Sequence, residues 1–326
     1  MLTYLQAIVI ALVQGVTELF PVSSLGHSVL VPAWIGGSWE QLVTQSAQAD
    51  SEASFYLAFI VALHVATALA LLWFFRADWA RIVAGFLRSA PRSLRARRIE
   101  VADSDERLAW LIVVATIPVG LTGLAFEHLF RTAFAKPVAA SAFLVLNGLI
   151  LLAGERARRA AEPAPRLEAA VLAGARSGVE TGRGRSALDI AEARASDVRI
   201  SRIPARDAVT IGSLQILALF AGISRSGVTM VGGLWRGLDH EDADRFAFLL
   251  ATPVILAAGL LKVPTLFGSA GDHIHGQIAV GFVVTGLTAY LSVRFLVRWF
   301  ETHTLQPFAV YCLIAGGVSL IHFAAV

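Results

Sequence analysis

Charged residues and cysteine are both scarce in this sequence. Asp, Glu, Lys and Arg make up only 16% of the 326 residues, whereas hydrophobic residues make up 56%. This balance excludes an ordinary soluble domain and is typical of a chain that crosses a membrane several times. Cys312 is the only cysteine, which excludes an internal disulfide. No Lys or Arg precedes Arg76, so the N-terminal apolar run lacks the basic start of a cleavable signal peptide, and we expect it to remain in the mature protein.

Six apolar runs predict transmembrane helices, because a helix of about 20 residues crosses a bilayer. Four of the runs have full length, and two are shorter or interrupted. The six runs are residues 55–75, 108–130, 138–153, 246–261, 278–296 and 307–323. We therefore expect six crossings.

Basic residues are concentrated in two stretches, 76–107 and 155–206, which together hold 19 of the 27 Lys and Arg residues. Cytoplasmic loops of membrane proteins are enriched in Lys and Arg, so we expect both stretches to be cytoplasmic and residues 38–54 and 268–276 to be periplasmic. The second stretch has few large apolar residues, which predicts a solvated loop. The net charge of +3 therefore reflects topology, and we expect no nucleic-acid partner.

Two further apolar segments, residues 2–35 and 209–234, are broken. Each has about 12 apolar residues, too few to cross, followed by Gly, Ser and other polar residues. A shift of 201 residues aligns "QGVTELFPVSSLG" with "QILALFAGISRSG", and three predicted spans follow each segment. Broken segments in corresponding places of two halves are typical of an inverted repeat with a site near the membrane midplane.

The predicted fold is an all-α polytopic membrane protein. Six transmembrane helices surround two re-entrant helix-loop-helix segments in an inverted-topology repeat, because an odd number of spans inverts the second half relative to the first. The first repeat is predicted at residues 1–153 and the second at 208–326, with an Arg-rich cytoplasmic loop at 154–207 between them.

Glu18 and Arg225 are the charged residues of the broken segments. Glu18 is the only formally charged residue among the first 39, and Arg225 is the only one between Asp207 and Arg236. An ionisable side chain at membrane depth costs about 2.5–3.5 kcal/mol on insertion scales, so it normally faces a partner or a wet cavity. One interpretation is therefore a structural ion pair that locks the two segments together. The other is a functional site.

The residues near Glu18 favour a functional site. Gln14 and Glu18 are four residues apart and so share one face of a helix, where their oxygens can hold a divalent cation such as Mg²⁺ if a phosphate completes the shell. The sequence "SSLGH", residues 23–27, predicts a turn whose hydroxyls and backbone N–H groups cap the next helix or cradle an anion. His27 can meet the hydroxyl of Ser24 as a base or proton shuttle.

The second broken segment contains "GISRSGVT", residues 222–229. Arg225 offers a planar, permanently charged guanidinium that suits phosphate oxygens. Two serines flank it, and the two glycines allow close approach of the backbone. Together with the first segment, these residues predict phosphoryl-transfer chemistry, which depends mainly on positioning and on neutralising negative charge.

The motifs "QGVTELFPVSSLGH" and "GISRSGVT" resemble the signature motifs of the bacitracin-resistance type of undecaprenyl-diphosphate phosphatase, and the spans match along nearly the whole chain. The resemblance implies a multi-pass enzyme of the bacterial inner (plasma) membrane that depends on a divalent metal, Mg²⁺ or Ca²⁺. It implies a polyprenyl diphosphate lipid as substrate, the monophosphate carrier of cell-wall synthesis as product, and an active site that opens to the periplasmic side of the lipid bilayer.

Residue by residue, the resemblance implies catalytic roles for Glu18, Ser24, His27 and Arg225, and metal binding by Gln14 and Glu18. It implies substrate binding by Ser23, Gly26, Gly222, Ser224, Ser226, Gly227 and Thr229. Gln14 stands where many family members have Glu, which leaves one carboxylate for the metal, and Ala221 replaces the usual Pro. His27, Ser24 and a metal-bound water are all candidates for the nucleophile, and the sequence leaves open whether the chain forms a homodimer.

Two other classes compete with this interpretation. An inverted-repeat transporter or lipid flippase would use Glu18 as a proton relay, but it has no need of the Ser-Arg-Ser-Gly cluster. The metal-independent lipid phosphatases related to phosphatidate phosphatase require a second histidine, followed by an acid, after the arginine motif. The next histidine here is His240, so the residues favour the diphosphatase over both alternatives.

Overall fold

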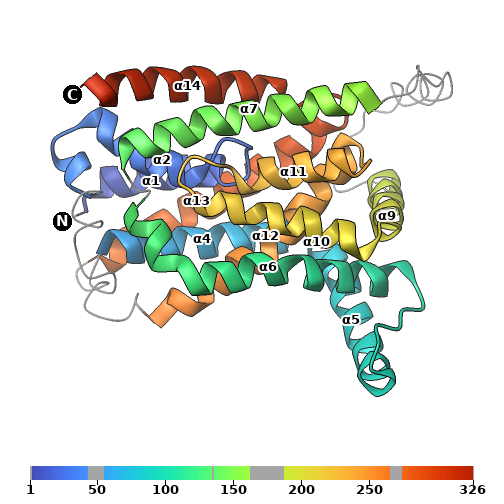
Figure 1. Ribbon diagram of the computed structural model, residues 1–326. Coiled ribbons are helices and arrows are strands. Elements are labelled where there is room, and N and C mark those ends of the chain that lie inside the picture. The colour runs from blue at the N-terminus through green and yellow to red at the C-terminus, as the bar shows by residue number, and fades with distance from the viewer. Residues whose placement is uncertain (1, 43–54, 134–135, 162–186, 265–273, 326) are drawn as a thin grey trace.

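The computed structural model of the chain describes residues 2–42, 55–133, 136–161, 187–264 and 274–325 (Figure 1). All regular elements within these ranges are helices, which confirms the predicted all-α class. In chain order they are α1 (Tyr4–Thr17), α2 (Ser24–Ile35), α4 (Phe55–Phe74), α5 (Arg76–Ala96), α6 (Ser104–Ala133), α7 (Pro137–Ala161), α9 (Ala187–Ser201), α10 (Ala205–Leu214), the short 3₁₀ helix η1 (Gln215–Leu219), α11 (Arg225–Trp235), α12 (His240–Lys262), α13 (His275–Phe300) and α14 (Gln306–Ala325).

Five helices of the described chain are long and apolar enough to cross a bilayer, and a sixth span results if α4 and α5, which are bent by 87° relative to each other, count as one. The five are Ser104–Phe126, Pro137–Ala160, His240–Leu261, His275–Phe300 and Gln306–Ala325. The prediction of a multi-pass membrane protein is confirmed. Helices α1 and α2, with 14 and 12 residues, are too short to cross.

The outer surfaces of the long helices are apolar, as expected for contact with lipid. Leu287 and Leu291 of α13 are each 63% exposed, and Ile321 of α14 is 75% exposed. Between neighbouring helices the contacts instead use small residues. Helices α7 and α14 lie side by side (Figure 1), and a Cβ atom at Gly316 would lie only 2.8 Å from the backbone nitrogen of Val145. Small residues at such a contact let two backbones approach closely.

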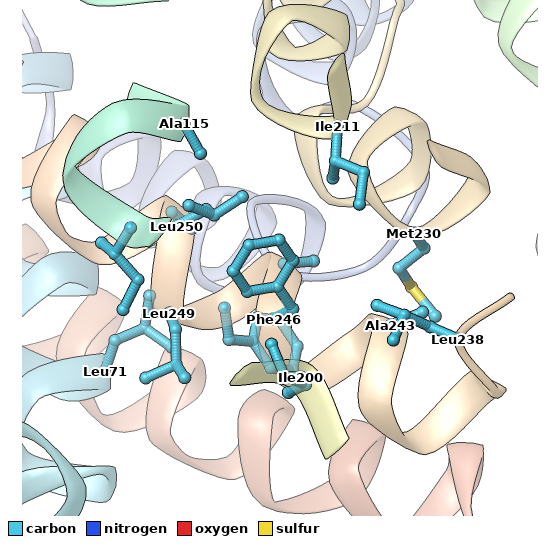
Figure 2. Packing of buried hydrophobic residues seen from close by; sticks show 14 of the residues in the cluster. Leu71, Ala115, Ile200, Ile211, Met230, Leu238, Ala243, Phe246, Leu249 and Leu250 are labelled. Carbon is cyan, nitrogen blue, oxygen red and sulfur yellow. The ribbon is translucent and has the colours of Figure 1, made fainter. Parts of the chain in front are cut away.

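Helix α12 lies at the centre of the larger hydrophobic core. Its Phe246, Leu249 and Leu250 are fully buried and face side chains from five other helices (Figure 2). Those side chains include Leu71 of α4, Ala115 of α6, Ile200 of α9, Ile211 of α10 and Met230 of α11. Burying apolar surface among protein side chains holds these helices together and fixes the position of α11.

Two of the short helices begin inside the molecule, where backbone N–H groups need partners. The Ser23 hydroxyl caps α2 by accepting from the backbone N–H of Gly26, and the Ser224 hydroxyl caps α11 by accepting from that of Gly227, both at 3.2 Å. Each serine therefore ends a turn and starts a helix. These two turns carry the polar motifs identified in the sequence.

The structure corrects one prediction about residues 155–206. The sequence predicts a solvated loop throughout, but α7 continues to Ala161 and α9 occupies Ala187–Ser201. The prediction is wrong for these residues, and residues 162–186 lie outside the described part of the chain. Helix α9 packs against α6 and α12, and its Ser196, Asp197 and Ile200 are buried. The polar composition of α9 is explained by its ion pairs with neighbouring helices, which it makes in addition to apolar contacts.

A buried ionic cluster fastens α9 to the bundle. The Asp197 carboxylate accepts hydrogen bonds from Arg81 of α5 at 2.7 Å and from Arg245 of α12 at 2.8 Å. Asp242 of α12 accepts two hydrogen bonds from Arg199 of α9, both at 2.7 Å. These hydrogen bonds raise the pKa of the Arg199 guanidinium above its usual value. The cluster joins three segments that are far apart in the sequence.

The substitution Asp197→Asn is expected to lower the thermal melting midpoint of the purified protein. It removes one counter-charge of Arg81 and Arg245, which keep Asp78 as a partner, and breaking a buried ion pair costs up to about 3 kcal/mol. The control is Glu100→Gln, which breaks an exposed pair with Arg98 whose side chain is 77% exposed. That change should cost less than about 1 kcal/mol. Equal melting midpoints for the two variants would contradict the role given to Asp197.

Candidate active site

The two polar turns meet inside the bundle. The Ser23 hydroxyl accepts a hydrogen bond from the backbone N–H of Gly222 at 3.1 Å, in addition to the one from Gly26. A Cβ atom at Gly26 would lie 2.9 Å from the Cα of Gly222, so a larger residue there would push the turns apart. Gly222 has a φ of +118°, a conformation that favours glycine. Gly26 and Gly222, both predicted as site residues, therefore allow the two turns to lie in close contact.

Asn147 of α7 holds both turns from the side, and sequence reasoning missed it. Its side chain is fully buried. The amide nitrogen donates to the backbone oxygen of Pro21, and the amide oxygen accepts from the backbone N–H of Ser224, both at 2.9 Å. The available signal was an asparagine inside an otherwise apolar span. Asn147 therefore gives a hydrogen-bond partner to one buried backbone group of each turn, which would otherwise be unsatisfied away from water.

Glu18 lies at the end of α1, at the centre of a cluster of polar side chains. Its Oε1 accepts from Nη2 of Arg225 at 2.5 Å. Its Oε2 accepts from the amide nitrogen of Gln14 at 3.0 Å and from the hydroxyl of Ser24. The structure thus brings together four of the predicted site residues, three from the first segment and Arg225 from the second. Charge-assisted hydrogen bonds of this kind are stronger than neutral ones.

His64 of α4 also faces Glu18 and was not predicted. Its Nε2 lies 3.5 Å from Oε2 of Glu18, and its Nδ1 lies 2.8 Å from the backbone oxygen of Ile60. A carbonyl oxygen can only accept, so Nδ1 carries a hydrogen. The only sequence signal was a histidine in the middle of an apolar run. His64 adds a second basic side chain next to the carboxylate.

His27 is near the first turn but is held away from Ser24. Its Nδ1 lies 2.7 Å from the backbone oxygen of Ser23, and its Nε2 lies 2.7 Å from the hydroxyl of Tyr311 on α14. In the neutral ring, Nδ1 donates to the carbonyl and Nε2 accepts from Tyr311. The described hydrogen bonds of Ser24 include one to Glu18 and none to His27. The expected hydrogen bond between Ser24 and His27 is therefore not formed here.

The serines of the second motif face the backbone of the first turn. Ser224 and Ser226 both lie 3.3 Å from the backbone oxygen of Phe20, and their hydroxyls are 3.1 Å apart. Thr229 instead donates to the backbone oxygen of Arg225 at 2.7 Å, within its own helix. A Cβ atom at Gly227 would lie 3.3 Å from Pro21. Most residues of the second motif therefore hold the junction of the turns, and Arg225 alone extends to the carboxylate.

The local backbone also favours an anion at this junction. Helices α2 and α11 both begin here, and helix N-termini present backbone N–H groups and a partial positive charge. Ser23 has a φ of +71°, which is rare for a residue with a side chain and costs about 1–3 kcal/mol. Strained residues of this kind cluster at functional sites.

The donor atoms fit a divalent cation only in part. Among the described residues there is no group of three or more His, Cys, Asp or Glu side chains that could hold a metal ion. However, Oε1 of Gln14 is buried without a hydrogen-bond partner, and it belongs to the residue that binds Glu18. Glu18 and Gln14 thus supply two oxygen atoms, and Mg²⁺ would need phosphate and water oxygens for the rest. Nε of Arg225 is likewise buried without a partner.

Comparisons with known proteins agree with the motifs. A sequence model of the family described as bacitracin resistance protein BacA matches residues 7–318. Undecaprenyl-diphosphatase 2 of Frankia alni is 57% identical over 348 residues, covering 99% of this chain and 98% of the relative. The undecaprenyl-diphosphatases of Mycolicibacterium paratuberculosis and Mycobacterium avium are each 56% identical over 323 residues, with the same coverage of 99% and 98%.

The family match spans both polar turns and every helix that positions them, from α1 to α14. The identities extend over nearly the full length of the relatives. The resemblance found from the two motifs is confirmed, and the chain belongs to the BacA family of bacitracin resistance proteins.

Proposed function

We propose that this protein removes the terminal phosphate of undecaprenyl diphosphate in the bacterial inner membrane and so regenerates the monophosphate carrier lipid. The activity named for its relatives supports this substrate. The observation that carries the proposal is the contact of Glu18 with both Arg225 and Ser24 where the two turns meet. A supply of carrier lipid sustains peptidoglycan synthesis and accounts for resistance to bacitracin.

Arg225 binds the diphosphate in this account. The Nη2 of Arg225 donates to Glu18, whereas its Nε has no hydrogen-bond partner. The guanidinium therefore has donors left for phosphate oxygens. Its planar fork matches two phosphate oxygens at once, which an ammonium cannot do. The N-termini of α2 and α11 add backbone N–H groups on the same anion. These groups neutralise the charge that spreads over the phosphoryl oxygens in the transition state.

Ser24 is the nucleophile that the contacts favour. Its hydroxyl already donates to Glu18, and a nucleophile hydrogen-bonded to a base is the usual arrangement for covalent catalysis. The Ser24 oxygen bonds to the terminal phosphorus, its proton passes to Glu18, and the phosphoanhydride bond breaks to release the lipid monophosphate. Water then attacks the phosphoserine, phosphate leaves, and Glu18 returns the proton to Ser24. The second proton of the attacking water stays on the released phosphate.

His27 acts as a positioning residue here. Both of its ring nitrogens have partners, Ser23 on one side and Tyr311 on the other. It therefore fixes the backbone of the turn that presents Ser24. The buried hydroxyl of Ser23 fixes the same turn against Gly222.

A divalent cation, Mg²⁺ or Ca²⁺, is part of the proposal. Glu18 and the unpartnered Oε1 of Gln14 are the residues that would hold it. When bound, the cation neutralises phosphate charge. A single carboxylate makes a weak site, so we expect metal and diphosphate to bind together.

We also propose that each broken segment is re-entrant and that the two halves form an inverted repeat. In support, α1 and α2 flank the first turn as α10 and α11 flank the second. Gln14 and Gln215, which the repeat aligns, are both buried with an unpartnered amide oxygen. The proposed site opens to the periplasmic side, with the arginine-rich segments cytoplasmic. Homodimer formation stays a prediction.

The transporter or flippase alternative uses Glu18 only as a proton relay. It gives no reason for a serine hydroxyl and an arginine to converge on that carboxylate. Release of inorganic phosphate from a polyprenyl diphosphate by the purified protein distinguishes the two, because a transporter releases none.

The variant Arg225→Lys is expected to lose about a hundredfold or more in the rate of phosphate release, because it keeps the charge but loses the planar fork. The assay is phosphate release from a polyprenyl diphosphate in detergent. If Arg225 served only as the ion-pair partner of Glu18, lysine would be tolerated. The double change Glu18→Gln with Arg225→Gln would then also be active, since it removes both buried charges.

The double variant is therefore expected to be as inactive as either single change. Thermal melting of Arg225→Lys, Glu18→Gln, Arg225→Gln and the double variant is the folding control. Near-wild-type activity of Arg225→Lys, or an active double variant, would overturn the assignment of Arg225 to the substrate.

The metal assignment makes a second prediction. Glu18→Gln should abolish turnover, whereas Gln14→Glu should stay active and need less Mg²⁺ or Ca²⁺ for half-maximal rate, because it adds a second carboxylate. Metal titrations after treatment with a chelator give both results. An unchanged metal requirement in Gln14→Glu, or activity in Glu18→Gln, would show that these residues do not hold the cation.

A further inference from the structure

Helix α5 departs from the direction of the spans. It follows α4 directly but is bent by 87° relative to it. Figure 1 shows α5 running across the end of the bundle and extending past α6. A helix at right angles to a transmembrane span lies parallel to the membrane plane. It has 21 residues, so it is about 30 Å long.

The face of α5 that packs against the protein carries both polar and apolar residues. Its buried residues are Asp78, Ile82, Gly85, Ser89 and Ser93. The Ser89 hydroxyl accepts from the indole N–H of Trp110 on α6 at 3.0 Å, and a Cβ atom at Gly85 would lie 2.9 Å from the backbone nitrogen of Glu106. Gly85 and Ser89 therefore let α5 lie close to α6, while Ile82 and Phe86 join the hydrophobic core on the same side of the helix.

The opposite face of α5 is apolar and uncovered. Val83, Leu87 and Leu94 are 48%, 65% and 77% exposed. At 100° per residue these three positions fall within about 40° of one another around the helix, so they form a single stripe. Ala80 and Pro91 extend the stripe and are also exposed. Water would be an unfavourable neighbour for this surface.

Arginines follow one edge of the stripe. Arg81, Arg88, Arg92 and Arg95 lie between the apolar stripe and the buried face. Arg88 and Arg92 pair with Glu106, whereas Arg95 has no ion-pair partner among the described residues. At the start of the helix, the Arg76 guanidinium lies over the ring of Trp73, which is 64% exposed. Exposed tryptophan next to arginine is typical of the level of the lipid headgroups.

We propose that α5 is an interfacial helix that binds the surface of a bilayer containing anionic phospholipids. Its apolar stripe enters the boundary between headgroups and acyl chains, to a depth of about 5–10 Å. Arg95 and the exposed sides of Arg88 and Arg92 contact the phosphate groups of the lipids, whereas Arg81 stays bound to Asp197. The lipid-facing surface of α4 continues directly into this stripe at Trp73 and Leu69, which are both exposed. That continuity makes the bilayer the occupant rather than a second copy of the chain.

The test measures the depth of a label on α5. Leu87→Cys is made on a Cys312→Ala background, labelled with a nitroxide, and reconstituted as the full chain into vesicles of phosphatidylcholine with or without phosphatidylglycerol. The matched control is Arg202→Cys, an exposed residue in the turn between α9 and α10. Relative accessibility to oxygen and to a water-soluble nickel complex reports depth. Because Leu87 and Arg202 are both exposed, neither change should disturb folding, and phosphate release checks this.

The label at position 87 is expected to favour oxygen and that at position 202 to favour nickel. The preference at position 87 should increase when phosphatidylglycerol is present. Equal nickel accessibility at both positions would overturn the proposal. So would spin–spin broadening at position 87, which would mean that a second copy covers the stripe. Equal depth with and without phosphatidylglycerol would show that the arginines do not bind anionic lipid.

Discussion

Two opposite charges buried among apolar helices are the constraint on which the rest of this structure depends. Glu18 and Arg225 lie 207 residues apart in the chain, and each alone would be costly at membrane depth. Their pairing requires two turns, each carried by short helices, to meet inside the bundle. In the proposed function, a carboxylate and a guanidinium that already face each other take up a proton and a phosphate without first being desolvated, so the pair that joins the turns would also serve catalysis.

The junction is held by hydrogen bonds that do not take part in the chemistry. Asn147 satisfies the backbone of both turns, and the Ser23 hydroxyl joins them at Gly222. These contacts keep Ser24 and Arg225 on the same carboxylate, and a displacement of about 1 Å would be costly for the proposed reaction. The ionic cluster around Asp197 fastens α9 to α5 and α12 and so supports α12, at the centre of the core, from the other end of the molecule.

The residues that could be predicted from the sequence are those that break a local pattern. Glu18 and Arg225 were found because each is a lone charge in an apolar segment, and the turns because Gly and Ser interrupt short apolar runs. Asn147, His64 and Tyr311 were missed because their partners are distant in the chain, and a single polar residue in a span does not indicate what it contacts. Helix α9 was missed because much of its contact with other helices consists of ion pairs, which a search for apolar periodicity does not detect.

The identity of the nucleophile tests the central claim most directly. The purified protein would be mixed with a polyprenyl diphosphate that carries ³²P in its terminal phosphate, quenched within one turnover, and digested for peptide mapping. Attack by the Ser24 hydroxyl predicts an acid-stable label on the peptide that contains Ser24. An acid-labile label on His27, or release of phosphate with no labelled protein at any time, would contradict the account.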